Sequence, residues 1–253
     1  MLPDLELKTF LEEKYLRYNN DAFIAPDPIS IPHRFTVKED IEISAFFVAT
    51  IAWGRRDVII RNGKKLMKLM GESPYDFVMN SCTKFNHFKH RTFNEIDTNN
   101  FVACIKNIYL THNGLEGLFN KLIKENHGDI QATISDFKRI FFSIPHDART
   151  TKHISDPSKG SSAKRINMFL RWMVRQDNHG VDFGIWNQIS PSVLHMPLDV
   201  HTGRVARRLG LLERKQDDWK AVAELTASLR VFDPSDPVKY DFALFGLGID
   251  EKF

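Results

Sequence analysis

The chain has 253 residues, enough for one sizeable core or for two lobes that share an interface. Apolar residues make up 42% and charged residues 26%, ordinary values for a folded protein, and the formal net charge of +3 is too small to identify a partner. Its two cysteines, Cys82 and Cys104, lack the spacing of a disulfide framework or a cysteine-ligated metal site. The acidic N-terminus is not typical of a signal peptide, and no run of about 18 apolar residues occurs. We therefore expect a cytoplasmic protein without a membrane partner.

Helical periodicity extends through nearly the whole chain, and no stretch shows convincing strand alternation. The expected fold class is therefore all-α. In chain order, the expected helices cover residues 4–18, 36–53, 57–70, 99–110, 114–125, 129–142, 162–176, 199–209, 218–231 and 237–247.

Polar residues that can cap helices support several of these boundaries. Thr36 and Glu39 have the spacing of a capping box. Asp57 can cap the following helix, and Ser161 or Ser162 can cap the helix of residues 162–176.

Basic residues gather in three stretches that contain few acids. They can form one positive face that follows a phosphate backbone, or they can be the solvated faces of separate helices. The three sets are Arg55, Arg56, Arg61, Lys64, Lys65 and Lys68; Lys159, Lys164, Arg165, Arg171 and Arg175; and Arg204, Arg207, Arg208, Arg214 and Lys215.

Asp199 follows Pro197 at the start of an expected helix. Because Pro197 interrupts the preceding segment, Asp199 can accept hydrogen bonds from the backbone N–H of His201 or Thr202 as an N-cap. An aspartate that serves only as a helix N-cap is a common arrangement. The same geometry can also hold an ionised carboxylate beside a reaction centre, because N-terminal N–H groups favour an anion.

Lys164 lies in the first turn of an expected helix, where the positive end of the helix dipole disfavours an ammonium. The positive charges of the neighbouring Arg165 and Lys159 also disfavour the ammonium form of Lys164. A lysine must be in the neutral amine form to act as a nucleophile. The alternative interpretation is a solvated lysine on a turn that faces phosphate.

The segments DPSKGSSAKRINMFLRWMVR and PLDVHTGRVARRLG together resemble the catalytic signature of the helix-hairpin-helix base-excision DNA glycosylases. In that superfamily a hairpin, a helix with the nucleophilic lysine, and a V-D-x-H-V-x-R segment with the essential aspartate occur in this order. The resemblance implies that Lys164 is the nucleophile and Asp199 the essential aspartate, and it is nearest the archaeal oxoguanine branch. Over its whole length the chain is also similar to an uncharacterised family of bacterial proteins.

The same resemblance implies two further sets of site residues. Residues expected to contact DNA include a short turn that fills the gap left by an extruded base, and the C-terminal helix is expected to contact that base. The DNA-contact set is Trp53, Arg55, Arg56, Lys159, Gly160, Arg165, His201, Arg204 and Arg207, and the base-pocket set is Asp241 and Phe245.

The fold implied by the resemblance has two helical lobes with a cleft between them. One lobe covers about residues 36–156, including a segment, 82–156, to which the resemblance assigns nothing. The other combines residues 1–35 with residues 157–253.

The implied function is excision of an oxidised purine such as 8-oxoguanine from double-stranded DNA, with AP lyase activity through a lysine Schiff base. We expect a monomer without a metal, cofactor or iron–sulfur cluster. The hairpin has one glycine, Gly160, where the superfamily has two, and this favours a second interpretation: a non-catalytic nucleic-acid-binding helix-hairpin-helix protein.

Overall fold

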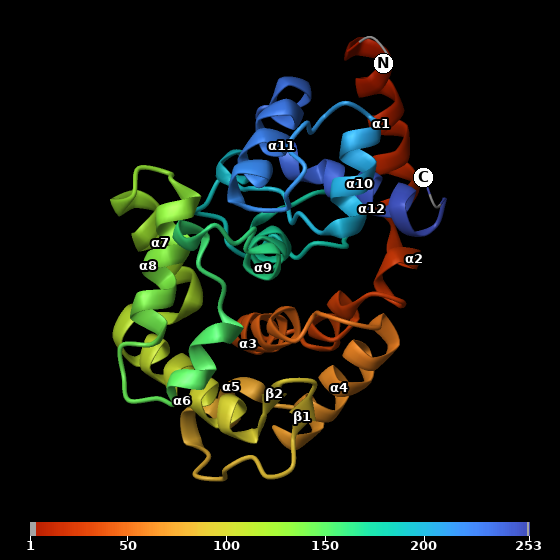
Figure 1. Ribbon diagram of the computed structural model, residues 1–253. Helices are drawn as coiled ribbons and strands as arrows, with labels where there is room; N and C mark the ends of the chain where they lie inside the picture. Colours follow the sequence, from red (N-terminus) through yellow and green to blue (C-terminus); the bar gives the residue numbers. More distant parts are fainter. Residues whose placement is uncertain (1–3, 252) are drawn as a thin grey trace. The chain divides into compact units, whose positions relative to one another are not determined.

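The computed structural model describes residues 4–251 and 253 and is predominantly helical (Figure 1), which confirms the all-α class. The chain divides into two compact units. Unit 1 comprises the described residues of 4–23, 129–132 and 156–253, and unit 2 comprises residues 24–128 and 133–155. Residues 24–35, expected with the N-terminal helix, belong to unit 2 because Ile29 and Ile31 are fully buried there beside its helices.

Unit 1 contains both expected catalytic residues, Lys164 and Asp199. Its helices are α1 (Asp4–Tyr18), η4 (Pro157–Lys159), α9 (Lys164–Val174), η5 (Pro191–Val193), α10 (Val200–Arg208), α11 (Trp219–Phe232), η6 (Pro237–Lys239) and α12 (Tyr240–Ile249). Two further helices, α2 (Asp21–Ile24) and α8 (Ile130–Phe141), include residues assigned to both units.

The C-terminal helix α12 packs between α1 and α10 in unit 1 (Figure 1). Two glycines allow this close approach. A Cβ atom at Gly246 would lie 2.3 Å from the ring of Tyr18 on α1. A Cβ atom at Gly248 would lie 3.3 Å from the Val205 side chain on α10. A larger residue at Gly246 would collide with α1 and one at Gly248 would press on α10, so α12 helps to position the helix that Asp199 precedes.

Unit 2 has a core of aromatic side chains around the buried helix α3. Phe46 on α3 stacks on Phe101 with ring centroids 6.0 Å apart, and Phe119 stacks on Phe137 at 4.4 Å. The elements are η1 (Pro28–Ser30), η2 (Pro32–Arg34), α3 (Lys38–Thr50), α4 (Arg56–Leu69), α5 (Pro74–Asn80), β1 (Lys89–His90), β2 (Phe93–Asn94), α6 (Glu95–His112), α7 (Gly114–Glu125) and η3 (Ala148–His153).

Several expected helix starts differ from those observed. The N-cap of α3 is Val37 and not Thr36, and no side chain caps that helix. Arg55 occupies the N-cap of α4, while Asp57 lies in its first turn and pairs with Arg55. Ala163 takes the position expected for Ser161 or Ser162. In all three helices the N-cap residue makes no side-chain hydrogen bond to the helix. The nearest polar residue in the sequence therefore does not mark the first residue of the helix.

Among the described residues, no helix combines the length and the apolar content that crossing a bilayer requires.

Candidate active site

Lys164 is the first residue of α9, and the turn before it holds an unusual conformation. Ala163, the N-cap, has φ +47°, the left-handed region that costs a residue with a Cβ about 1–2 kcal/mol. Its backbone N–H donates to Ser161 Oγ at 3.2 Å, and Asn167 Nδ2 donates to the carbonyl of Ser162 at 3.1 Å. These contacts hold the strained turn and fix the direction in which Lys164 leaves the backbone.

Asp199 caps α10 as expected from the sequence. Its Oδ1 accepts hydrogen bonds from the backbone N–H of His201 at 2.9 Å and of Thr202 at 3.0 Å. The carboxylate is therefore oriented by two backbone donors through one oxygen, and the other oxygen is left for a different partner.

That partner is Lys164. Its Nζ lies 3.6 Å from Asp199 Oδ2, and the two side chains are 26% and 25% exposed. The amine and the carboxylate thus meet at the N-termini of α9 and α10, and about a quarter of each side chain is exposed to solvent. A carboxylate at this distance can hold the amine in place and can accept a proton from it.

A second, buried carboxyl group interacts with this pair. Asp241 on α12 forms an ion pair with Arg171 of α9, and Arg171 Nε donates to Asp182 Oδ1 at 3.2 Å. Burial raises the pKa of Asp241 to about 6; Arg171 opposes this rise, Asp199 adds to it and Lys164 opposes it. The charge of Asp241 therefore depends on that of the Lys164–Asp199 pair.

Arg175, one helical turn after Arg171, extends this network through the interior of unit 1. It pairs with Asp177 at 2.6 Å, with Asp182 at 3.2 Å and with Asp236 at 2.8 Å. Arg171 and Arg175 are 3% and 1% exposed. The basic stretch of residues 159–175 therefore does not form one positive face: two of its five bases point inward and are neutralised by aspartates, because a buried guanidinium requires acidic partners.

The other residues expected at DNA in unit 1 have varied surroundings. Lys159 and His201 are exposed, and Gly160 has φ +86°. Burial lowers the pKa of the half-buried Arg165 to about 10, which leaves it charged at neutral pH.

Both arginines of α10 have partners within unit 1. Arg204 is exposed and donates to the carbonyl of Gly248 at 3.0 Å. Arg207 donates to the carbonyl of Arg214 and pairs with Asp217 at 2.6 Å. Of the two, Arg204 has the more exposed guanidinium-bearing side chain and no acidic partner among the described residues.

The two residues expected at the extruded base lie on α12. Asp241 is occupied by its ion pair with Arg171. Phe245 is half-buried, and its ring lies 5.9 Å from that of Phe23. Both side chains therefore contribute to the packing of unit 1.

The turn expected to fill a base gap lies in unit 2. Trp53 is half-buried, with ring centroids 4.9 Å from His90 and 6.1 Å from His153. Arg55 is exposed and pairs with Asp57 at 2.9 Å, and Arg56 is the first residue of α4.

Arg171 is the residue near the site that the sequence interpretation overlooked. The sequence interpretation groups it with the other bases of residues 159–175, yet it lies two turns after Lys164 on α9 and joins Asp182 to Asp241. No local signal marks this role, because its partners Asp182 and Asp241 lie 11 and 70 residues away in the sequence. No cluster of three or more histidine, cysteine or acidic side chains suited to a metal occurs among the described residues.

Comparison with known families overturns one expectation. Residues 27–250 match the family model described as "Protein of unknown function (DUF2400)". No curated protein and no solved structure matches the chain. The similarity to an uncharacterised family is confirmed, whereas the resemblance to the helix-hairpin-helix glycosylases is wrong, since the model that matches is a different one. The quoted segments are short and include cap and turn residues such as Asp199 and Gly160, which recur at the ends of unrelated helices.

Proposed function

The chain belongs to the DUF2400 family, and from the geometry of its site we propose that it is a DNA glycosylase with AP lyase activity on oxidised purine lesions such as 8-oxoguanine. The observation that carries the proposal is the 3.6 Å separation of Lys164 Nζ and Asp199 Oδ2 at an accessible position. An amine and an oriented carboxylate are the two groups that Schiff-base excision requires.

The proposed reaction begins with the neutral amine of Lys164. It attacks C1′ of the damaged nucleotide, and the N-glycosidic bond breaks with its electron pair moving to the base, which takes up a proton. The nitrogen then loses one proton, the C1′–O4′ bond of the sugar ring breaks with O4′ taking up a proton, and a protonated imine forms between Lys164 and C1′. Removal of a C2′ proton then expels the 3′ phosphate, which breaks the strand.

Asp199 has two roles in this scheme. The transition state for base loss carries positive charge on the sugar, so a fixed carboxylate stabilises it. The same carboxylate accepts a proton from the ammonium of Lys164. Because Oδ1 is held by two backbone N–H groups, Oδ2 stays in place throughout without reorganisation.

The test is reduction of the imine with borohydride, which converts it into a stable protein–DNA adduct. Duplexes carry 8-oxoguanine, an abasic site or no lesion. The wild type should form an adduct with the first two, and Lys164→Gln should form none. Lys220→Gln is the matched control, because Lys220 is an exposed lysine of unit 1 to which the proposal gives no role, and its adduct yield should equal that of the wild type. Absence of an adduct with every damaged duplex would refute the proposal.

The second candidate function is non-catalytic binding of nucleic acid. The observation in its favour is the presence of exposed bases without an acidic partner among the described residues, of which Lys159 is one in unit 1. In that case the protein binds duplexes with an affinity that falls as salt rises, equally with and without a lesion, and borohydride traps nothing.

A further inference from the structure

Helix α4 in unit 2 carries a row of four cations. Arg61, Lys64, Lys65 and Lys68 are spaced at i, i+3, i+4 and i+7, so their side chains share one face of the helix. All four are exposed. We call these residues the α4 stripe. It spans about 10 Å along the helix axis.

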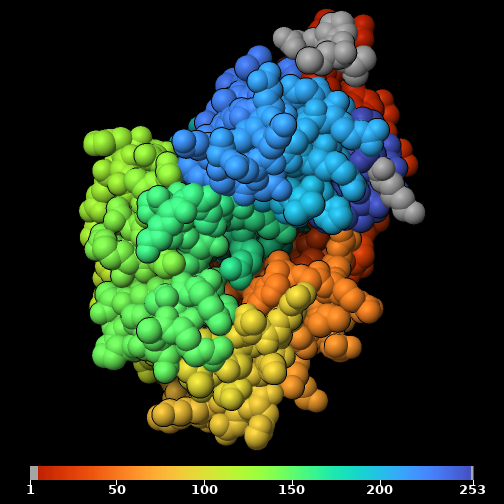
Figure 2. Space-filling view, viewed as in Figure 1, coloured from red at the N-terminus to blue at the C-terminus, as the bar shows by residue number. Residues whose placement is uncertain are grey.

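The opposite face of α4 is packed into unit 2. Ile59, Leu66 and Met67 are buried, and a Cβ atom at Gly63 would lie 3.0 Å from the Ile31 side chain. The apolar side of the helix therefore belongs to the core. Atoms of the orange segment that contains α4 lie at the surface of unit 2 (Figure 2), and the exposed residues of α4 include the four cations.

The stripe lacks acidic partners. Within the part of the chain that the structure describes, none of its four members forms an ion pair, and the acids on either side are already engaged: Asp57 with Arg55 and Glu72 with Arg34, the latter at 2.7 Å. Like charges three and four residues apart destabilise a helix. No ion pair among the described residues offsets the repulsion among the four side chains, and an anion bound along the stripe would reduce it.

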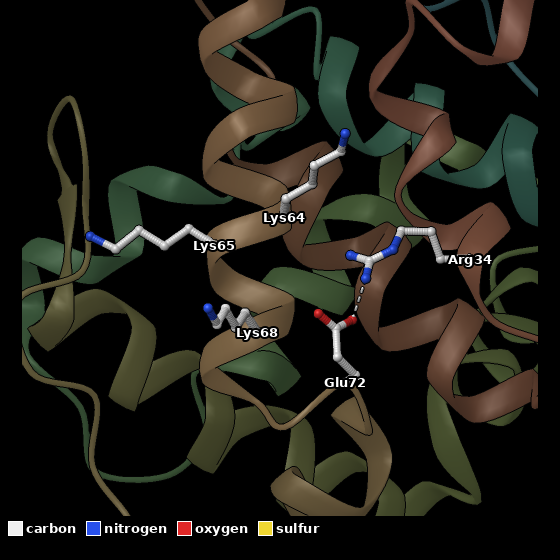
Figure 3. Close-up of a pocket in the computed structure, with 5 residues that line it drawn as sticks. All are labelled: Arg34, Lys64, Lys65, Lys68 and Glu72. Carbon is white, nitrogen blue, oxygen red and sulfur yellow. Dashed lines mark hydrogen bonds and ion pairs between the residues drawn. The ribbon is translucent and has the colours of Figure 1, made fainter.

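The stripe borders an open depression of about 470 Å³, lined by Arg34, Lys64, Lys65, Lys68 and Glu72. Figure 3 shows Lys64 extending on the side of α4 where Arg34 lies and Lys65 extending to the other side. The ammonium groups therefore spread across the helix and do not converge on a single point. This arrangement suits an extended chain of anionic groups better than one isolated phosphate.

We propose that the α4 stripe binds the phosphate backbone of a DNA duplex. A small phosphorylated metabolite fits less well, because the depression is open and its lining residues are all charged, with no apolar or aromatic side chain to orient a small molecule. A membrane fits less well because the apolar face of α4 is buried and cannot insert. The choice of DNA among polyanions rests on the proposed function. The inference that the stripe binds an extended polyanion does not depend on that function.

The test compares two triple variants of the full chain. The first is Lys64→Gln, Lys65→Gln, Lys68→Gln. The matched control is Lys84→Gln, Lys124→Gln, Lys152→Gln, which removes the same charge from exposed lysines elsewhere in unit 2. Affinity for a labelled duplex is measured by fluorescence anisotropy over a range of salt concentrations, and flotation with anionic vesicles is a parallel assay.

The stripe variant should bind the duplex roughly tenfold or more weakly than the wild type at low salt, and its slope of log affinity against log salt should be less steep by about 2–3, since each phosphate contact contributes about 0.9. The control should retain the wild-type slope. Equal losses in both variants, no loss in the stripe variant, or binding to vesicles without binding to the duplex would each overturn the proposal.

This outcome is independent of the lyase reaction. Salt-dependent binding through the stripe without a borohydride adduct supports the stripe and refutes the glycosylase proposal. Adduct formation that is unaffected by the stripe variant, together with unchanged binding, supports the enzyme and refutes the stripe.

Discussion

Arg171 and Asp241 form an ion pair in the interior of unit 1, and the pKa of the Asp241 carboxyl is nevertheless raised to about 6. Burial is the main cause, and the negative charge of Asp199 contributes. Above this pH the site contains two carboxylates close to one lysine, whereas below it Asp241 is neutral.

This shift predicts how stability changes with pH. An unfolded aspartate titrates at 3.8, so between that pH and about 6 the folded chain binds more protons at Asp241 than the unfolded chain does. The contribution of Asp241 to the free energy of unfolding therefore falls as pH rises through this window, by up to about 3 kcal/mol. The side chain of Asp241→Asn does not titrate, so this variant lacks the pH-dependent contribution of Asp241 to the free energy of unfolding.

Urea denaturation of the wild type and Asp241→Asn at several pH values between 4 and 7 measures the effect. The difference in unfolding free energy, wild type minus variant, should decrease as pH rises. A difference that is constant over this range would show that the Asp241 carboxyl titrates alike in both states.

Substitutions at Asp199 separate its structural role from its chemical role. Asparagine retains an oxygen that can accept the N–H groups of His201 and Thr202, so Asp199→Asn should change the free energy of unfolding by less than about 1 kcal/mol. Asp199→Ala removes the cap and should cost about 1 kcal/mol. Both should reduce the rate of adduct formation about 100-fold or more, because neither has a carboxylate.

Denaturation and trapping kinetics for the two variants check this prediction together. If Asp199→Asn forms the adduct at the wild-type rate, the carboxylate serves only as a helix cap.

The left-handed conformation of Ala163 predicts opposite effects of two substitutions. Ala163→Gly relieves the strain but gains freedom in the unfolded chain, so the net change in stability should be within about 1 kcal/mol. Ala163→Val places a β-branched residue at φ +47° in a buried position and should destabilise by about 2 kcal/mol or more. Urea denaturation decides, and equal stability of the three proteins would contradict the conformation described for this turn.

Repulsion within the α4 stripe predicts that removing its charges stabilises the protein in the absence of any ligand. The triple substitution of Lys64, Lys65 and Lys68 by glutamine eliminates four like-charge pairs at i+3 or i+4 spacing, and glutamine has nearly the helix propensity of lysine. At low salt the gain should be about 1 kcal/mol, and it should vanish at about 1 M salt, where charges are screened beyond about 3 Å. The control at Lys84, Lys124 and Lys152 should show no comparable gain in thermal or urea unfolding.

Local features of the fold could be read from the sequence more readily than distant contacts. Asp199 caps α10 because the signal for a cap lies within four residues of it. The helix periods around α6 and α7 were likewise evident, although the sequence assigned no role to that region. Where a cap depends on backbone geometry, as at Ala163, the sequence misleads, because an alanine gives no indication of a left-handed turn.

The electrostatics of the site depend on tertiary contacts and could not be predicted in the same way. Arg171 and Arg175 belong to a stretch whose charge indicates a solvated surface, yet both are buried because aspartates from other segments surround them. By contrast, the α4 stripe is visible in the sequence as bases at helical spacing. That the stripe lacks acidic partners is evident only from the structure, where Glu72 pairs with Arg34.

The most direct measurement of the central claim is mass-spectrometric mapping of the borohydride-reduced adduct formed with an 8-oxoguanine or abasic duplex. The account predicts a single modified peptide that contains the start of α9, with the sugar remnant on Lys164. A remnant on Lys159, on any other lysine or on the terminal amine would contradict the assignment of Lys164 as the nucleophile that Asp199 orients.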